Sequence, residues 1–181
     1  MGSLKIKPIE KEDMRQLWQI GFAVENPEWS KWNGPYYDDY KAYTFEEFCN
    51  TFFFYNEGKY KQGIYVDDVL VGMLFRYWED EKTRWLEIGI VIYDENYWGK
   101  GFGTQALREW ISDTFDTFDM IEHIGLTTWS GNERMMKSSK KLGLKQEARI
   151  RKVRYWQGVY YDSVKYGVLR EEWGVRKNSL S

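Results

Sequence analysis

Side chains suited to burial recur every three or four residues between Phe102 and Phe118, which is the spacing that places them on one face of an α-helix. The stripe consists of Leu107, Trp110, Ile111, Thr114, Phe115 and Phe118. This pattern predicts a long amphipathic helix that begins near Gly101. It is the clearest helical signal in the chain.

Three shorter stretches have the same period and predict helices at residues 10–24, after Tyr43, and at residues 132–141. The stripe of the second stretch consists of Phe45, Phe48, Cys49, Phe52 and Phe53. Because Cys49 lies on this stripe, we expect a buried structural thiol rather than a nucleophile. Residues 25–43 contain Pro27 and Pro35 without a clear period, which predicts a loop or a broken helix.

Alternating or continuous apolar runs predict seven strands. Their ranges are 4–9, 62–66, 69–78, 85–93, 121–129, 148–156 and 159–169. Asp67-Asp68 and Gln157-Gly158 separate two pairs of these runs and predict hairpins. The order of strands and helices indicates a single α/β (α+β) domain over residues 1–173 with a mixed sheet, followed by a loose tail over residues 174–181.

The composition of the chain limits the classes of protein to which it can belong. The chain has 181 residues, of which 43% are hydrophobic, so we expect a packed globule. The formal net charge is −2 and the basic residues are spread along the chain, which disfavours a nucleic-acid binder. Cys49 and His123 are the lone residues of their types, so no disulfide or zinc cluster is expected, and His123 is expected to be structural. No apolar run is long enough for a membrane span, and we expect a cytoplasmic protein.

A glycine-rich segment separates the predicted strand at 85–93 from the long helix. Gly99, Gly101 and Gly103 let backbone N–H groups approach an anion, and the start of a helix adds unpaired donors and a partial positive charge. The segment does not match a P-loop, because Lys100 lies between glycines and no Ser or Thr follows it. It also lacks the glycine spacing of a dinucleotide fingerprint.

The segment resembles the pyrophosphate loop of the GCN5-related N-acetyltransferase (GNAT) superfamily, whose pattern is Gln/Arg-x-x-Gly-x-Gly/Ala. Here the loop is Trp98-Gly99-Lys100-Gly101-Phe102-Gly103, with Trp98 as a departure that is typical of the branch resembling RimJ/RimL ribosomal-protein N-acetyltransferases. Further matches are Gly125-Leu126, Asn132, Lys141-Leu142-Gly143-Leu144 and the ending from Gly158 to Trp173. The resemblance runs from about Leu4 to Trp173.

The resemblance implies a mostly antiparallel central sheet of six to seven strands flanked by about four helices, and acetyl-CoA as cosubstrate without a metal. It implies cosubstrate contacts at Val91, Ile92, Tyr93, Gly99, Lys100, Gly101, Phe102, Gly103, Thr104 and Asn132. The loop residues and Thr104 would hold the pyrophosphate, and the backbone of residues 91–93 would meet the pantetheine amides. Asn132 would also contact the pantetheine arm, although a helix N-cap is an equally good interpretation.

Glu87 is the candidate general base. It stands alone in the apolar run Leu86-Glu87-Ile88-Gly89-Ile90, where an unpaired charge would be costly. It precedes Trp98 by 11 residues, the spacing that the superfamily's catalytic glutamate keeps from its loop. The alternative is an edge or surface glutamate paired with a base such as Arg84.

Ser139 occupies the position at which many relatives have a tyrosine that protonates the leaving thiolate. A serine can hydrogen-bond the sulfur but is a poor acid, so thiolate protonation by solvent is also plausible. The other interpretation of Ser139 is an exposed polar residue on a helix.

The sequence therefore predicts an acetyl-CoA-dependent N-acetyltransferase that acts by direct attack in a ternary complex. The acceptor would be a primary amine, either a protein N-terminus or a small molecule. We expect the acceptor pocket to involve the loop from Trp29 to Tyr43, with Asp38 and Asp39, and the hairpin from Tyr155 to Tyr161. The alternative is that these segments pack as a lid or a dimer contact. The alternative function, motivated by Trp98 and Ser139, is a CoA-binding regulatory module without catalysis. The abundance of aromatic residues also makes a homodimer reasonable.

Overall fold

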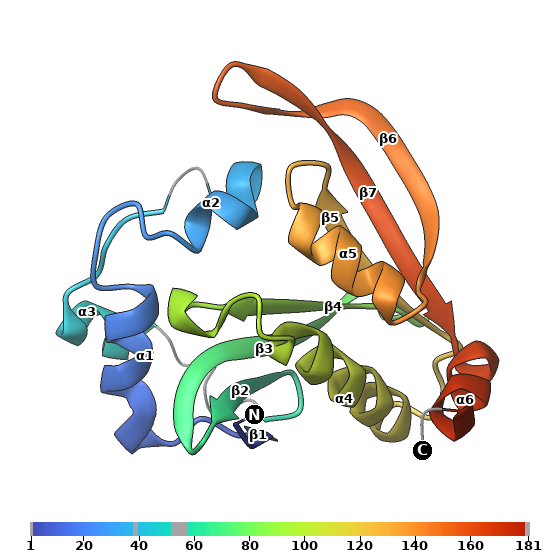
Figure 1. The fold of residues 1–181 in the computed structure, drawn as a ribbon, viewed down its shortest axis with the longest axis horizontal. Coiled ribbons are helices and arrows are strands. Elements are labelled where there is room, and N and C mark those ends of the chain that lie inside the picture. The colour runs from blue at the N-terminus through green and yellow to red at the C-terminus, as the bar shows by residue number, and fades with distance from the viewer. Residues whose placement is uncertain (1, 38–39, 52–57, 180–181) are drawn as a thin grey trace. The chain divides into compact units, whose positions relative to one another are not determined.

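The computed structural model describes residues 2–37, 40–51 and 58–179 and contains one seven-stranded sheet of order β1-β2-β3-β4-β5-β7-β6 (Figure 1). The strands are β1 (Leu4–Lys7), β2 (Lys61–Val66), β3 (Val69–Asp80), β4 (Trp85–Ile92), β5 (His123–Trp129), β6 (Lys145–Trp156) and β7 (Val159–Leu169). All seven predicted strands are confirmed, with small shifts at their ends.

The sheet is mixed and mostly antiparallel, as predicted. β1 pairs with β2, β2 with β3, β5 with β7 and β6 with β7, all antiparallel. The parallel pair is β4 with β5, through Leu86↔Ile124 and Glu87↔Gly125. Both predicted hairpin turns are present. Asp67 and Asp68 have φ angles of 51° and 63°, and Gln157 and Gly158 have φ angles of 47° and 81°, as two-residue hairpin loops require.

Six α-helices and three 3₁₀ segments lie in the described parts of the chain. The α-helices are α1 (Met14–Gly21), α2 (Ser30–Asn33), α3 (Phe45–Thr51), α4 (Phe102–Thr117), α5 (Glu133–Lys141) and α6 (Arg170–Ser179). The 3₁₀ segments are η1 (Lys11–Asp13), η2 (Gly34–Tyr37) and η4 (Glu95–Tyr97). The four predicted helices correspond to η1 with α1, to α3, to α4 and to α5; the predicted stripe positions Phe52 and Phe53 lie outside the described residues.

One expectation about helices is confirmed and one was wrong. Residues 30–37 contain the short α2 followed by η2, which is the broken helix that one of the two interpretations predicted, and these elements bring the total above four. The C-terminal residues 174–179 are not a loose tail, because α6 continues through them to Ser179. Acidic residues in its first turn, Glu171 and Glu172, favour the start of this helix through its dipole.

The chain divides into two compact units, which are described separately. The first comprises residues 1–75 and 90–107, and the second residues 76–89 and 108–181. The core of the first unit is an aromatic cluster around Phe22, whose ring centroid lies 5.3 Å from that of Tyr93 and 5.9 Å from that of Trp29. The indole N–H of Trp29 donates to the Gly21 carbonyl at 2.8 Å. Trp29 is therefore a core residue, which supports the packing interpretation of the start of the aromatic loop.

In the second unit, α4 packs through the buried Trp110, Ile111 and Phe115. The buried Arg76 of β3 lies 3.9 Å from the centroid of the Trp110 ring, and its guanidinium pairs with Asp113 at 2.9 Å. Near the C-terminal end of α4, the Arg170 guanidinium donates to the carbonyl oxygens of Phe115, Phe118 and Ile121. The Phe115 carbonyl lies in the last turn of α4 and the Phe118 carbonyl directly follows it, where a cation is also favoured by the helix dipole.

No helix in the described ranges combines the length and the apolar character that a transmembrane span requires.

Candidate active site

The glycine loop in the first unit has the backbone conformation that only glycine adopts without strain. Gly99 and Gly101 have φ angles of 72° and 87°, in the left-handed region. A Cβ atom at either position would meet nothing within 4 Å, so both glycines border open space. The loop therefore presents accessible backbone rather than a packed turn.

α4 begins directly after this loop. Its first hydrogen bond runs from the Gln105 amide to the Gly101 carbonyl at 3.0 Å, which places the amides of residues 102–104 in the first turn. Phe102 is buried and packs against the Tyr97 ring, whereas Lys100 is exposed, with its ammonium 5.8 Å from the same ring. The predicted arrangement of strand, glycine turn and helix start is thus present.

Trp98, the departure from the family pattern, joins the loop to β4. Its indole N–H donates to the Ile92 carbonyl at 2.9 Å, and its ring meets the edge of Trp32 at a centroid distance of 6.5 Å. The tryptophan therefore holds the loop against the end of the strand.

The three predicted backbone contacts at the end of β4 are not equivalent. The Tyr93 amide donates to the Val71 carbonyl of β3 at 2.9 Å, so it is committed to the sheet. Successive residues of a strand direct their peptide groups to opposite edges, so those of Val91 and Tyr93 face the same edge and that of Ile92 the other. Of the three residues, Ile92 is the one whose amide is directed away from β3.

Glu87 in the second unit is buried, with 2% of its surface exposed, yet its charge has partners. The Thr127 hydroxyl donates to its two oxygens at 3.0 and 2.7 Å, and the Tyr77 hydroxyl donates at 3.1 Å. The Lys165 ammonium lies 3.4 Å from Oε1 and also donates to the Thr127 hydroxyl at 2.9 Å. A buried carboxylate needs such hydrogen bonds and a counter-charge to stay ionised at a tolerable cost.

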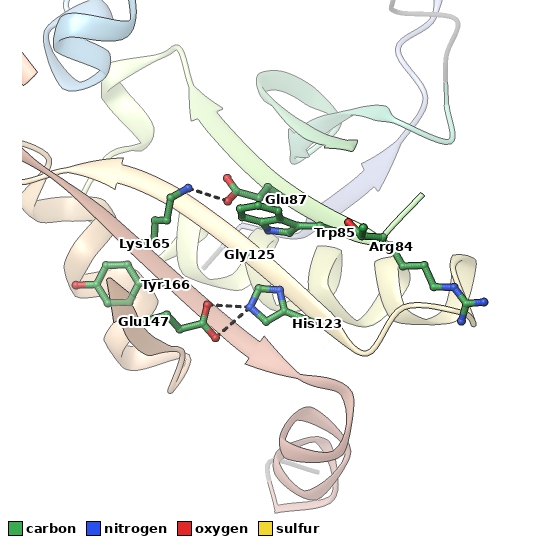
Figure 2. A pocket seen from close by; sticks show the side chains of 9 residues that line it. Arg84, Trp85, Glu87, His123, Gly125, Glu147, Lys165 and Tyr166 are labelled. Atoms are coloured by element: carbon green, nitrogen blue, oxygen red, sulfur yellow. Dashed lines mark hydrogen bonds and ion pairs between the residues drawn. The ribbon is translucent and has the colours of Figure 1, made fainter. Parts of the chain in front are cut away.

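Lys165 and Thr127 are partners of Glu87 that the apolar run around it does not reveal. The alternative of an edge or surface glutamate paired with a base such as Arg84 is wrong, because Glu87 is buried and β4 lies between β3 and β5. The Arg84 guanidinium donates to the Met120 carbonyl at 3.4 Å, and Figure 2 shows its side chain directed away from Glu87.

Glu87 borders a pocket of about 340 Å³ in the second unit (Figure 2). Its wall includes Trp85, Glu87, His123, Gly125, Glu147 and Lys165. These side chains come from β4, β5, β6 and β7, so the pocket lies on one face of this part of the sheet. Carboxylates, an ammonium group, an imidazole and an aromatic ring share a space large enough for water and a small substrate group.

His123 is a polar residue whose role the sequence did not reveal. Its Nε2 lies 3.0 and 2.8 Å from the two carboxylate oxygens of Glu147. The expectation of a purely structural histidine rested on the absence of a partner motif, and the partner lies 24 residues away on another strand. The alternation along β5, which directs His123, Gly125 and Thr127 to one face, was the available signal.

Asn132 caps α5, as one of its two interpretations predicted. Its side-chain Oδ1 accepts the Met135 amide at 3.1 Å. This bond occupies the carbonyl of the side-chain amide and leaves the NH₂ group to serve as a donor elsewhere.

Ser139 is fully buried, so its interpretation as an exposed polar residue is wrong. Among the described residues its hydroxyl has no hydrogen-bond partner, and the Tyr166 hydroxyl shares this property. A buried polar group without a partner costs free energy, and such a group is commonly satisfied by a water or a ligand. Asp38 and Asp39, predicted for the acceptor pocket, lie outside the described residues.

Comparison with known proteins identifies the family. The family described as "Acetyltransferase (GNAT) domain" matches residues 3–145, which is more than half of the chain. The chain belongs to the GNAT acetyltransferase family.

Two relatives from Bacillus subtilis (strain 168) resemble this GNAT protein in sequence. "Putative ribosomal N-acetyltransferase YdaF" is 31% identical over 64% of this chain and 62% of its own length. "SPbeta prophage-derived uncharacterized N-acetyltransferase YokL" is 28% identical over 59% of each chain. The matched stretches thus span about three fifths of both relatives.

Solved structures confirm the GNAT fold. An acetyltransferase of the GNAT family from Bacillus anthracis superposes with a TM-score of 0.72 at 21% identity, covering 95% of this chain and 98% of its own. Spermidine N-acetyltransferase from Vibrio cholerae, in complex with CoA and spermine, has a TM-score of 0.72 at 17% identity, covering 94% of this chain and 97% of its own.

The residues of this GNAT protein fit acetyl-CoA at two places. Gly99 and Gly101 border open space at the start of a 16-residue helix, which suits a pyrophosphate, and the buried Ser139 hydroxyl has a hydrogen bond to give. The described residues contain no cluster of three or more His, Cys, Asp or Glu side chains that could hold a metal ion.

Proposed function

We propose that this protein is an acetyl-CoA-dependent N-acetyltransferase that transfers the acetyl group directly to a primary amine. The observation that supports this best is Glu87, a buried carboxylate that is held by Thr127 and Lys165 and also borders a pocket. A carboxylate in this setting can accept a proton from an amine without changing its own position.

The glycine loop and the end of β4 would bind the cosubstrate. The amides around Gly99, Gly101 and the first turn of α4 would bind the pyrophosphate, with Lys100 and Thr104 adding a charge and a hydroxyl. The Ile92 amide would bond the pantetheine arm. Bound acetyl-CoA supplies the acetyl group as a thioester.

Glu87 and its neighbours would take part in proton transfer. An amine is protonated at neutral pH and attacks only as the free base, so Glu87 would take its proton. Thr127 and Tyr77 would hold the carboxylate in place through their hydrogen bonds. Asn132 would donate from its NH₂ group to the pantetheine arm, and the Ser139 hydroxyl would donate to the sulfur.

The acceptor class remains the one expected from the sequence, a protein N-terminus or a small amine. The name of YdaF supports a ribosomal protein as the acceptor. The similarity to the Vibrio cholerae enzyme is evidence for the fold alone and favours no particular acceptor. In the pocket itself, the carboxylates of Glu87 and Glu147 and the face of Trp85 favour a cationic amine.

A CoA-binding module without catalysis is the second candidate. The contact of 3.4 Å between Lys165 and Glu87 favours it, because a carboxylate already paired with an ammonium group is a weaker proton acceptor. Trp98 and Ser139, the departures from the family pattern, point in the same direction.

Acetyl transfer is tested by incubating the protein with acetyl-CoA and a panel of peptides with free N-termini, polyamines and aminoglycosides, and following the free CoA thiol. Glu87→Gln is expected to lower kcat by about a hundred-fold or more while acetyl-CoA still binds. Glu79→Gln is the matched control, since Glu79 is an exposed glutamate on the neighbouring β3. Tight acetyl-CoA binding without turnover of any amine would favour the module instead.

A further inference from the structure

The pair of His123 and Glu147 lies in the same pocket as Glu87, but the acetyl transfer described above does not use it. Glu147 holds the Nε2 of the imidazole through both of its oxygens, at 3.0 and 2.8 Å. The side chains of His123 and Glu147 are 28% and 40% exposed, whereas that of Glu87 is 2% exposed. The pair is thus in part open to solvent, whereas Glu87 is not, and all three residues line the same pocket (Figure 2).

The side chains of Glu87 and His123 both approach Gly125, which has no side chain to fill the gap between them. A Cβ atom on Gly125 would lie 3.3 Å from Glu87 Oε1 and also 3.3 Å from His123 Cε1. The two side-chain atoms are thus separated by no more than twice that distance, with no side chain from position 125 between them. One water molecule can bridge such a gap, since the pocket is polar and large enough to hold it.

We propose that His123, supported by Glu147, receives the proton that Glu87 takes from the amine and passes it to solvent. This inference rests on the proposed N-acetyltransferase function and extends it to the release of the proton. The O–H bond of protonated Glu87 breaks toward a bridging water, and that water gives a proton to His123. The carboxylate of Glu87 is thereby restored for the next amine.

The hydrogen bond to Glu147 fixes the tautomer that this transfer requires. A neutral imidazole that donates its Nε2–H to a carboxylate has its free lone pair on Nδ1, the nitrogen that can accept a proton. The same carboxylate stabilises the imidazolium once it forms. His123 is then near solvent, where it can release the proton.

Other charged groups around the pocket do not provide this route. Lys165 faces Glu87 from β7, but an ammonium group has no site for another proton. Tyr77 donates to Glu87 from β3, and Arg84 is bonded to the Met120 carbonyl. Of the side chains that line the pocket, His123 is the one imidazole, a group that can both accept and release a proton.

The first test compares kcat of wild type and His123→Gln with a turned-over amine across the pH range. Glutamine keeps a hydrogen bond to Glu147 but carries no proton, so kcat is expected to fall about ten-fold or more and to lose its dependence on an ionisation near neutral pH. KM for acetyl-CoA should stay unchanged. Glu122→Gln, which removes an exposed carboxylate next to His123, is the control.

A rescue experiment separates proton transfer from a structural effect. Imidazole added to His123→Ala should restore part of the lost kcat, which a structural role of the ring would not allow. Full activity of His123→Gln with an unchanged pH profile, or no rescue by imidazole, would overturn the relay while the acetyltransferase proposal stands.

An NMR titration tests the pair without turnover. Because the chain contains one histidine, its imidazole proton signals are unambiguous. If Glu87 and His123 are coupled across the gap, Glu87→Gln should move the midpoint of this titration to lower pH, since a nearby negative charge favours the imidazolium. An unmoved midpoint would overturn the coupling. Failure of the wild type to acetylate any amine would instead count against the proposed function.

Discussion

The indole N–H of Trp98 donates a hydrogen bond of 2.9 Å to the carbonyl oxygen of Ile92, and this bond ties the glycine loop to the end of β4. Trp98 stands where the family pattern has Gln or Arg, so a side chain that could address the ligand is replaced by one that supports the loop. The hydrogen bond by which Trp98 supports the loop thus explains the departure from the pattern.

Trp98→Phe should weaken acetyl-CoA binding without unfolding the protein. The substitution keeps an aromatic ring but removes the donor, and a net hydrogen bond contributes about 1 kcal/mol. If the bond orders the loop, Kd should rise about five-fold in calorimetry. An unchanged Kd would show that the loop keeps its conformation without this bond.

Gly101→Ala should affect binding more than stability. Alanine in the left-handed region costs about 1 kcal/mol, and the space around the new Cβ is open in the protein alone. A pyrophosphate seated on the loop would occupy that space, so Kd for acetyl-CoA should rise at least about ten-fold, which corresponds to about 1.4 kcal/mol. Gly174→Ala is the control, because Gly174 also borders open space and lies in α6. If Gly101→Ala lowers the free energy of unfolding and the free energy of acetyl-CoA binding by equal amounts, backbone strain alone explains both losses.

Tyr65→Phe and Tyr166→Phe should have opposite effects on the free energy of unfolding. Both rings are buried, but the Tyr65 hydroxyl donates to Asp13 at 2.7 Å, whereas the Tyr166 hydroxyl has no partner among the described residues. Loss of the first bond should destabilise the protein by about 1.5–3 kcal/mol. Removal of the second hydroxyl should leave the stability unchanged or increase it. Urea unfolding measures both, and a clear loss in Tyr166→Phe would reveal a bound water or ligand at that hydroxyl.

Tyr40 should make part of the stability sensitive to alkaline pH. Burial, together with the nearby Glu25 and Tyr43, raises the pKa of Tyr40 from 10.0 to about 12. Since the folded state holds the phenol proton more firmly than the unfolded state, this contribution is present in full below pH 10 and is lost as the pH rises toward 12.

Unfolding of wild type and Tyr40→Phe on either side of pH 10 tests this expectation. Phenylalanine at this position should reduce the alkaline loss of stability, although it also removes the hydroxyl bonds to the Gly21 and Val24 carbonyls at all pH values. Tyr155→Phe, at a ring with 61% of its surface exposed, is the matched control. If the free energy of unfolding depends on pH in the same way for wild type, Tyr40→Phe and Tyr155→Phe, the alkaline loss of stability does not come from Tyr40.

Features encoded over short stretches were predictable. The apolar stripe after Phe102 predicts α4, and the pairs Asp67-Asp68 and Gln157-Gly158 predict the two hairpins, because helix period and turn chemistry act between near neighbours. The tail from Gly174 was missed for the opposite reason. Its own residues have no apolar stripe, but α6 starts from Arg170, whose guanidinium is bonded to carbonyls at the end of α4.

By itself, the sequence determined the elements, the glycine loop and the membership of the GNAT family, since each depends on residues that are close along the chain or ordered in a recognisable pattern. The tertiary structure decided the environments of the side chains that carry the chemistry. It brought Lys165 to Glu87 across 78 positions and Glu147 to His123 across 24, and it buried the Ser139 hydroxyl without a partner. These relationships follow from the pairing of β4, β5, β6 and β7 in one sheet, because the order of strands and their register place residues together that no local pattern connects.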